Sequence, residues 1–332
     1  MKIDKMSETV KKPQINVASI ETEPNPSAIW YELMLAIVIL LGFLVRVIYY
    51  VGESIYTLIN PPPPKSVKGE IVLITGTGHG IGKQLALLYA SEGSTVIGWD
   101  INEANNQKTI KEIAEKGYPK AYSYVCDISN RDNVLQVAKR VQQEVGDVTI
   151  LINNAGIMPT RPLLEHSHVE IEKIFGINVM AQFWTLEAFL PSMKKNNYGH
   201  IVCLSSMAGQ VGLVNLVPYC ASKFAVRGLM EALHEELRGH PKNNIHLSSI
   251  YPFMVDTGLC KNPVIQFPNL MPMEKPSEVA KTIMHCQRNN ILEKSIPGYM
   301  AGFVNVPRFL LPLKAGLDLK DTFGAFVDSD KK

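Results

Sequence analysis

The stretch IVLITGTGHGIGKQLALLYASEG, from Ile71 to Gly93, constrains the fold more than any other part of this 332-residue chain. An apolar, β-branched run is followed by a glycine-rich segment and then by a run rich in leucine and alanine. β-branched residues favour strands, whereas leucine and alanine favour helices. The stretch therefore predicts a strand, a tight loop and a helix in direct succession, which is an opening unit of α/β folds.

Short β-branched runs continue to alternate with stretches of helical length through the rest of the chain. These runs are apolar throughout, which is typical of parallel strands that are covered on both faces. We predict a Rossmann-type doubly wound parallel sheet, α/β in class, in a single domain over residues 69–298. The expected strands are 71–75, 95–100, 121–127, 148–155, 200–206 and 245–252, with a short seventh near 294–297.

Composition narrows the classes of partner and compartment. The chain is 46% hydrophobic and 19% charged, with a formal net charge of +2, which gives no electrostatic reason to expect a nucleic-acid partner. Its five cysteines are widely spaced and form no CxxC pair. We expect free thiols in a reducing, cytosol-facing compartment, without a disulfide framework and without a metal site.

The N-terminal part differs in composition from the domain that follows it. Residues 1–27 are polar and are expected to be disordered. The run AIWYELMLAIVILLGFLVRVIYYV begins at Ala28 and carries only Glu32 and Arg46 as charges. As a helix of roughly 24 residues it would reach about 36 Å, enough to cross a hydrocarbon core. We expect a membrane anchor over 28–59 and a proline-rich linker over 60–68.

The topology of this anchor stays open between a spanning helix, a hairpin and a helix that lies in one leaflet. If the anchor spans, the cations Arg46, Lys65 and Lys68 on its distal side favour a cytosolic position for everything after Pro64.

The glycine segment has the pattern TGxxxGxG, which is formed by Thr75, Gly76, Gly80 and Gly82. The common GxGxxG pattern is not present, because Ile81 lies where its third glycine would be. Glycines let the chain turn sharply and let its backbone approach a pyrophosphate at the positive end of a helix. Such a loop alone could be only a tight turn. Its place between a strand and a helix favours nucleotide binding.

Six residues at and near the strand ends extend the predicted nucleotide site. Asp100 can accept hydrogen bonds from the ribose hydroxyls and repels a 2′-phosphate, so it favours NAD over NADP. His79 lies in the glycine loop and keeps that choice open, since it could also lie near the ribose. The carboxyl ends of parallel strands line the ligand crevice. The remaining candidates are Asp127 after the third strand, and Asn154, Ala155 and Gly156 after the fourth.

The segment YCASKFA places Tyr219 and Lys223 one helical turn apart, shortly after Ser206 at the end of the fifth strand. A phenol has an unperturbed pKa near 10, and an adjacent ammonium favours its ionised form. Tyr219 could then accept a proton from an alcohol while Ser206 holds the substrate oxygen. Lys223 could also reach the ribose of a nicotinamide cofactor.

Taken together, these motifs resemble the short-chain dehydrogenase/reductase family over about residues 68–298. The resemblance implies that Tyr219 is the general acid/base, Lys223 its partner and Ser206 the substrate-orienting hydroxyl. It also implies that Asn178, in GINVMAQFW, holds a water in a proton relay.

The family's loop over the nicotinamide corresponds to PFMVDT, which keeps Pro252 and Thr257 but has Phe253 where the family has glycine. Residues 253–275 fall where the family has a substrate lid, and an ordinary surface loop is the alternative. The apolar tail, 299–332, could contact a membrane surface or pack on the domain as a terminal helix.

More narrowly, the chain resembles the branch of membrane-bound retinol dehydrogenases and 17β-hydroxysteroid dehydrogenase-like enzymes of the endoplasmic reticulum or lipid droplet. That resemblance implies a lipophilic alcohol or ketone as substrate, contact with membrane lipid, a homodimer and a catalytic domain that faces the cytosol. The segment PFMVDTG favours a retinoid over a steroid. Two alternatives stay open: a non-catalytic membrane or lipid-droplet scaffold with the same fold, and an NADP-dependent reductase of retinal or a ketosteroid.

Overall fold

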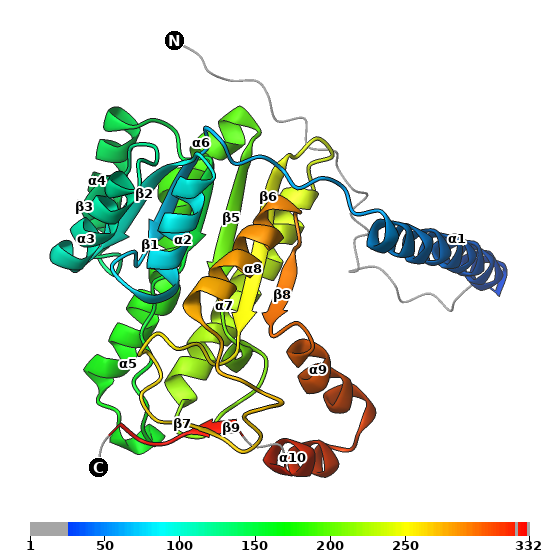
Figure 1. The fold of residues 1–332 in the computed structure, drawn as a ribbon. Helices are drawn as coiled ribbons and strands as arrows, with labels where there is room; N and C mark the ends of the chain where they lie inside the picture. Colours follow the sequence, from blue (N-terminus) through cyan, green and yellow to red (C-terminus); the bar gives the residue numbers. More distant parts are fainter. Residues whose placement is uncertain (1–25, 323–324, 331–332) are drawn as a thin grey trace. The chain divides into compact units, whose positions relative to one another are not determined.

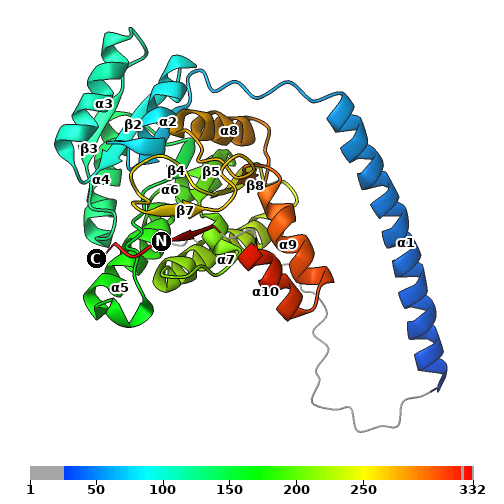
Figure 2. The same ribbon diagram turned by 60° about the horizontal axis from the view of Figure 1, so that its bottom comes forward.

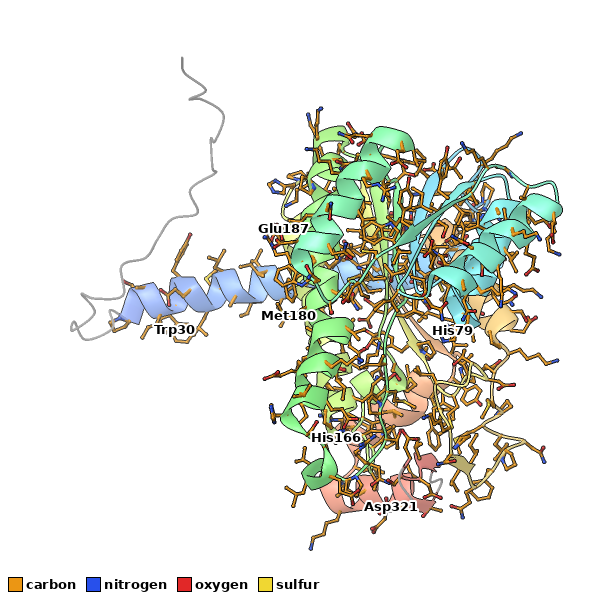
Figure 3. The ribbon with its side chains drawn as sticks, turned by 90° about the vertical axis from the view of Figure 1, so that its left-hand side faces the viewer. Trp30, His79, His166, Met180, Glu187 and Asp321 are labelled. Carbon is orange, nitrogen blue, oxygen red and sulfur yellow. The ribbon has the colours of Figure 1, made fainter. Side chains whose placement is uncertain are left out.

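The computed structural model describes residues 26–322 and 325–330, and the chain divides into two compact units between Pro62 and Pro63. The first unit contains helix α1, Pro26–Ile59, which is one uninterrupted helix and has no buried residue. Figure 3 shows the side chain of Trp30 projecting from it. Among the described helices, α1 is long and apolar enough to cross a membrane.

The helix α1 begins at Pro26, slightly before the expected anchor, and its continuity argues against the hairpin alternative. Proline is favoured at the first position of a helix because its missing N–H is not needed there. The predicted polar tail lies, for residues 1–25, outside the described residues.

The second unit is built on a seven-stranded parallel sheet of order β3-β2-β1-β4-β5-β6-β8 (Figure 1). This confirms the predicted doubly wound sheet. The strand order reverses between β1 and β4, and the carboxyl ends on either side of such a reversal frame a ligand crevice. The strands are β1 Ile71–Thr75, β2 Thr95–Asp100, β3 Tyr122–Val125, β4 Ile150–Asn153, β5 Gly199–Leu204, β6 Ile245–Pro252 and β8 Glu293–Ile296.

Helices cover both faces of this sheet, which explains why its strands are apolar throughout. Figure 2 shows α2 and α8 on one side of the sheet and α7 on the other. The helices are α2 Gly80–Ser91, α3 Glu103–Glu115, α4 Arg131–Glu144, α5 His168–Phe175, α6 Ala181–Asn196, α7 Val217–Arg238, α8 Pro276–Arg288, α9 Met300–Leu310 and α10 Leu313–Thr322. Shorter turns are η2 Leu163–Glu165, η3 Gly176–Met180 and η4 Met207–Gly209.

Strand β1 illustrates how successive residues serve opposite faces. Val72 and Ile74 pack in one buried cluster with residues of α2 and α8, such as Leu85 and Ile283. Leu73, between them, packs in the other cluster with residues of α4, α6 and α7. A central strand therefore buries side chains on both of its faces, and most of those in β1 are apolar.

The second unit begins before the expected boundary at residue 69. Val67 is buried in the core cluster of α2 and α8, and its carbonyl accepts a hydrogen bond from Ser94 Oγ at 2.7 Å. The Lys65 N–H donates to the carbonyl of Arg288 at 2.9 Å. The last residues of the proline-rich segment are therefore part of the domain.

A small second sheet lies at the edge where β6 and β8 end (Figure 1). Its strands, β7 Pro263–Ile265 and β9 Ala325–Val327, pair antiparallel. Neither was among the expected strands. Strand β7 lies within the predicted lid segment, and β9 lies within the predicted C-terminal tail.

Candidate active site

A cavity of about 320 Å³ opens at the carboxyl ends of the central strands. Its volume is within the range of small-molecule sites. Most of the residues expected at a site from the sequence line it: Gly76, His79, Gly80, Ile81, Asp100, Asp127, Asn154, Ala155, Gly156, Ser206, Tyr219, Lys223, Pro252 and Thr257. Three expected residues, Thr75, Gly82 and Asn178, do not line it.

The glycine loop requires its glycines for two different reasons. Gly76 and Gly80 have φ angles of 76° and 57°, which L side chains rarely adopt. A Cβ built at Gly82 would lie 2.0 Å from the carbonyl oxygen of Gly76. Gly82 therefore lets the first turn of α2 lie against the loop, so that the positive end of the helix points toward the cavity.

Thr75, which is expected from the sequence to contact the cofactor, does not line the cavity. It lies at the end of β1 and supports the neighbouring loop through hydrogen bonds. Its hydroxyl is buried and accepts hydrogen bonds from the N–H groups of Asn154 at 3.0 Å and Ala155 at 3.1 Å. The side-chain amide of Asn154 donates to the carbonyl of Thr75 at 2.8 Å. These bonds fix the loop that follows β4 to the end of β1.

Asp100 is held at the cavity edge by the backbone. Its two carboxylate oxygens accept hydrogen bonds from the N–H groups of Gly78 and Asn102, each at 2.8 Å. His79 precedes α2, is exposed and makes no side-chain capping bond (Figure 3). Apart from His79, the one basic side chain among the described residues that line the cavity is Lys223.

Asp127 stands at the end of β3, on the same rim. Its carboxylate accepts hydrogen bonds from the N–H of Ser129 at 3.0 Å and from the Ser129 hydroxyl at 2.7 Å. The glycine cradle, the start of α2 and the Asp100 carboxylate together fit a dinucleotide, because they offer space for a pyrophosphate and acceptors for ribose hydroxyls.

Tyr219 lies in the first turn of α7, is 6% exposed and lines the cavity beside Ser206, which acts on the pKa of the phenol as a hydrogen-bond partner. The Ser205 hydroxyl instead donates to the carbonyl of Lys223 at 2.8 Å. Lys223 Nζ donates to the carbonyl of Leu204 at 2.8 Å and lies 5.7 Å from the centroid of the Tyr219 ring. Ser206, and not Ser205, therefore faces the phenol.

The electrostatics of this pair differ from the sequence-based expectation. Burial raises the pKa of Tyr219 to about 12, and the hydrogen bond with Ser206 opposes that rise. Burial also lowers the pKa of Lys223 to about 8. Lys223 is not among the groups that shift the pKa of Tyr219, in contrast to the expectation that it lowers this pKa. The Tyr219 phenol is therefore protonated and neutral at neutral pH.

Asn178 lies behind the cavity, on the π-helical turn η3. Its amide group pairs with the backbone of Ile157, accepting at 2.9 Å and donating at 3.0 Å, and it also donates to Ser222 Oγ at 3.0 Å. A Cβ built at Gly156 would lie 3.2 Å from Asn178 Oδ1 and 3.6 Å from Lys223 Nζ. Gly156 therefore allows both polar groups to approach one backbone.

The lid segment closes onto the glycine loop even though Phe253 replaces a glycine. Phe253 has no positive φ, its N–H donates to the carbonyl of Ile296 at 2.8 Å, and its side chain packs against the cavity wall. The methyl group of Thr257 would lie 3.1 Å from a Cβ built at Gly80. The substitution therefore leaves the lid in contact with the loop.

The sequence-based prediction missed one wall of the cavity. Val327, on β9, lines the cavity and is 2% exposed. A single valine in an apolar tail carries no motif, so only the pairing of β9 with β7 shows where it lies.

Comparisons with known proteins agree with this geometry. A sequence profile described as short chain dehydrogenase matches residues 70–264. Short-chain dehydrogenase/reductase family 16C member 6 of Bos taurus is 44% identical over 81% of this chain and 84% of its own length. Epidermal retinol dehydrogenase 2 of Homo sapiens is 39% identical over 86% and 97%. 17-beta-hydroxysteroid dehydrogenase 13 of Homo sapiens is 39% identical over 82% and 89%.

Solved structures share the fold. A short chain dehydrogenase/reductase from Burkholderia phymatum in complex with NAD has a TM-score of 0.66 and 25% identity, covering 74% of this chain and 96% of its own. A metagenomic short-chain oxidoreductase in complex with NADP has a TM-score of 0.59 and 26% identity, covering 70% and 96%.

Proposed function

Because the chain belongs to the short chain dehydrogenase family, we propose that it is a membrane-associated oxidoreductase that oxidises a lipophilic alcohol with NAD. The observation that carries the proposal is that Ser206, Tyr219 and Lys223 line one cavity together with a glycine cradle and Asp100. The relatives named as retinol and 17-beta-hydroxysteroid dehydrogenases support an alcohol or ketone as substrate.

The bound cofactor would supply the acceptor for the hydride of the alcohol. Ser206 would hold the substrate oxygen, and Tyr219 would take its proton in oxidation or donate a proton to it in reduction. Lys223, bonded to the carbonyl of Leu204, would present its remaining N–H groups to the cofactor ribose. Asn178 would act from behind the cavity, where its amide is bonded to Ile157 and Ser222 and supports the loop that carries Gly156.

The direction of the pKa shifts predicts the pH dependence. Oxidation needs ionised Tyr219, whose pKa lies at about 12, so its rate is expected to rise with pH from 7 to 9. The rise is at most about tenfold per pH unit, because the ionised fraction of a single group grows by no more than that. Reduction uses the neutral phenol and is expected not to rise.

The measurement is kcat from pH 6 to 10 for an alcohol and for its ketone, with the full chain in lipid vesicles. Oxidation that is fastest at pH 6, or reduction that accelerates with pH, would contradict the assignment of Tyr219. Failure of every alcohol and ketone to turn over would contradict the enzyme and favour the scaffold. The intact Ser206, Tyr219 and Lys223 argue against that scaffold.

A lipophilic substrate suits the wall beside Tyr219. The described side chains there are apolar or sulfur-containing and come from the loop after β4, the segment before α7 and the lid: Met158, Leu213, Leu216, Met254, Leu259 and Cys260. Such a wall offers burial to a hydrocarbon and no partner to a charged group. Retinoids, steroids and long-chain alcohols all meet this requirement.

We propose that α1 anchors the chain to the endoplasmic reticulum or lipid-droplet membrane, with the catalytic domain in the cytosol. Lys65 and Lys68 follow α1 closely and favour the cytosolic side. The C-terminal helices supply a second contact. The inner side of α9 packs on the domain through Met300 and through Asn305, which donates to Gln210 Oε1 at 2.8 Å.

The outward side of α9 and α10 is apolar and exposed, and we name it the terminal patch: Val306, Phe309, Leu310, Leu313 and Leu317. Apolar patches of this kind mark interaction sites, and the apolar side chains of the patch suit the surface of a lipid membrane. We therefore propose that the tail does both: the inner side of α9 packs on the domain, and the outward side of α9 and α10 contacts lipid.

The terminal patch predicts lipid contact at Phe309. In vesicles with brominated lipid, the tryptophan added by Phe309→Trp is expected to be quenched, measured as the difference from the unmodified chain. The control is Val125→Trp, on the exposed side of the edge strand β3, which is expected not to be quenched. Equal quenching at the two positions, or none at Phe309→Trp, would contradict the contact.

A homodimer is the expected assembly. Met180, on η3, and Phe183, on α6, are 39% and 46% exposed, and Phe224 on α7 is 37% exposed (Figure 3 labels Met180). Exposed large apolar side chains on the helices that hold Asn178 and Tyr219 favour an interface there.

A further inference from the structure

The end of the chain returns to the cavity after α10. Strand β9 pairs with β7 of the lid, in the register Pro263 with Val327 and Ile265 with Ala325. Val327 is buried in the same cluster as Tyr219, Leu216 and Met254. The C-terminal segment, residues 325–330, is thus a wall of the cavity on the side of the phenol.

Backbone hydrogen bonds tie this segment to a first loop, the one that follows β4. The N–H of Asp330 donates to the carbonyl of Thr160 at 2.7 Å, and the N–H of Thr160 donates to Asp330 Oδ2 at 3.1 Å. Thr160 is fully buried. The same loop brings Met158 to the cavity and carries Asn154 to Gly156.

Two further loops are held in the same way. Asn215, before α7, donates its side-chain amide to the carbonyl of Val327 at 3.0 Å. In the lid, the carbonyl of Asn262 accepts from the Asp328 N–H at 3.1 Å, and the Asn262 amide donates to the carbonyl of Ser329 at 3.2 Å. One short segment therefore joins all three loops around the substrate side of the cavity.

We propose that the C-terminal segment is the outer wall of the substrate half of the cavity and that Val327 is a specificity-determining residue for the alcohol. The proposal rests on the proposed oxidoreductase function. The buried cluster of Val327 contains Tyr219 and lid residues but no residue of the glycine loop, so its size acts on the alcohol and not on the cofactor.

The volume at position 327 sets how much bulk fits beside the reacting carbon. No charged side chain belongs to this cluster, so the part of the substrate that contacts Val327 is hydrocarbon. Val327→Ala enlarges the space and favours broad, ring-shaped alcohols such as a 17β-hydroxysteroid. Val327→Trp reduces it and leaves room for slim primary alcohols.

The first test compares kcat/KM for a 17β-hydroxysteroid and for a long-chain primary alcohol, using the full chain in vesicles. Val327→Trp is expected to lower the steroid-to-primary ratio about 10-fold or more, and Val327→Ala to raise it. The affinity for NAD is expected to be unchanged in both. The control, Val125→Trp, adds the same side chain to an exposed position outside the cavity. An unchanged ratio, or a changed affinity for NAD, would overturn the assignment of Val327.

The second test needs no turnover, so it separates this proposal from the proposed function. In a chain that lacks residues 325–332, amide hydrogen exchange at Val264 and Ile265 of β7 and at Thr160 is expected to accelerate about 10-fold or more, because β9 and Asp330, their partners, are gone. Asp330→Ala is expected to accelerate exchange at Thr160. Unchanged amide exchange in both variants would show that the C-terminal segment does not hold these loops. It would contradict the proposed wall even if the enzyme is active.

Discussion

Replacing Tyr219 by phenylalanine is expected to lower kcat about 1,000-fold and to leave the affinity for NAD unchanged. The substitution removes the phenolic hydroxyl that lies beside Ser206 at the cavity wall. It keeps the ring that packs with Leu216 and Met254, so the fold and the cofactor half of the cavity are preserved. The measurements are single-turnover reduction of NAD and NAD binding by fluorescence.

The matched control is Tyr89→Phe. Tyr89 is a fully buried tyrosine whose hydroxyl donates to Gln287 at 3.2 Å, and it does not line the cavity. Its loss is expected to affect stability and not kcat. If Tyr219→Phe kept full turnover, or if it lost cofactor binding together with turnover, Tyr219 would not be the acid/base.

Replacing Asp100 by asparagine is expected to lower the preference for NAD over NADP about 10-fold or more. The carboxylate lies at the cavity edge, where its charge repels a 2′-phosphate, and no arginine among the described cavity residues would hold that phosphate. Asparagine removes the charge and keeps one acceptor, which can serve the Gly78 N–H, while the bond from the Asn102 N–H is lost.

The measurement is kcat/KM for NAD and for NADP with one alcohol. Asp132→Asn removes an equal charge from an exposed side chain of α4 and is expected to leave the ratio unchanged. A protein that prefers NADP before any substitution would contradict the choice of NAD, as would an unchanged ratio in Asp100→Asn.

The sheet could be predicted because its central strands are buried on both faces, which gives apolar runs such as Ile71–Thr75 in place of alternation. Val72, Leu73 and Ile74 are all fully buried although they serve two different clusters. Strands of three residues, such as β7 and β9, are too short to show any period. Their positions depend on tertiary pairing, which a local pattern does not contain.

The candidate site was predictable as a set of residues but not as a set of contacts. Gly76 and Gly82 belong to one motif, yet Gly76 lines the cavity and Gly82 permits the packing beneath it. The pKa of Tyr219 depends on burial and on Ser206, whereas Lys223 donates to the carbonyl of Leu204. Neither follows from the spacing of a tyrosine and a lysine on one helix.

The central claim is that the chain transfers a hydride from a lipophilic alcohol to NAD with Tyr219 as base. Its most direct test is deuterium transfer from alcohols labelled on the carbinol carbon, with the full chain in vesicles and the reduced cofactor analysed by mass spectrometry. The panel contains retinol, a 17β-hydroxysteroid and a long-chain alcohol. We expect deuterated NADH with at least one of these alcohols and none in Tyr219→Phe. Saturable NAD binding without labelled NADH from any of them would contradict the claim and identify a scaffold.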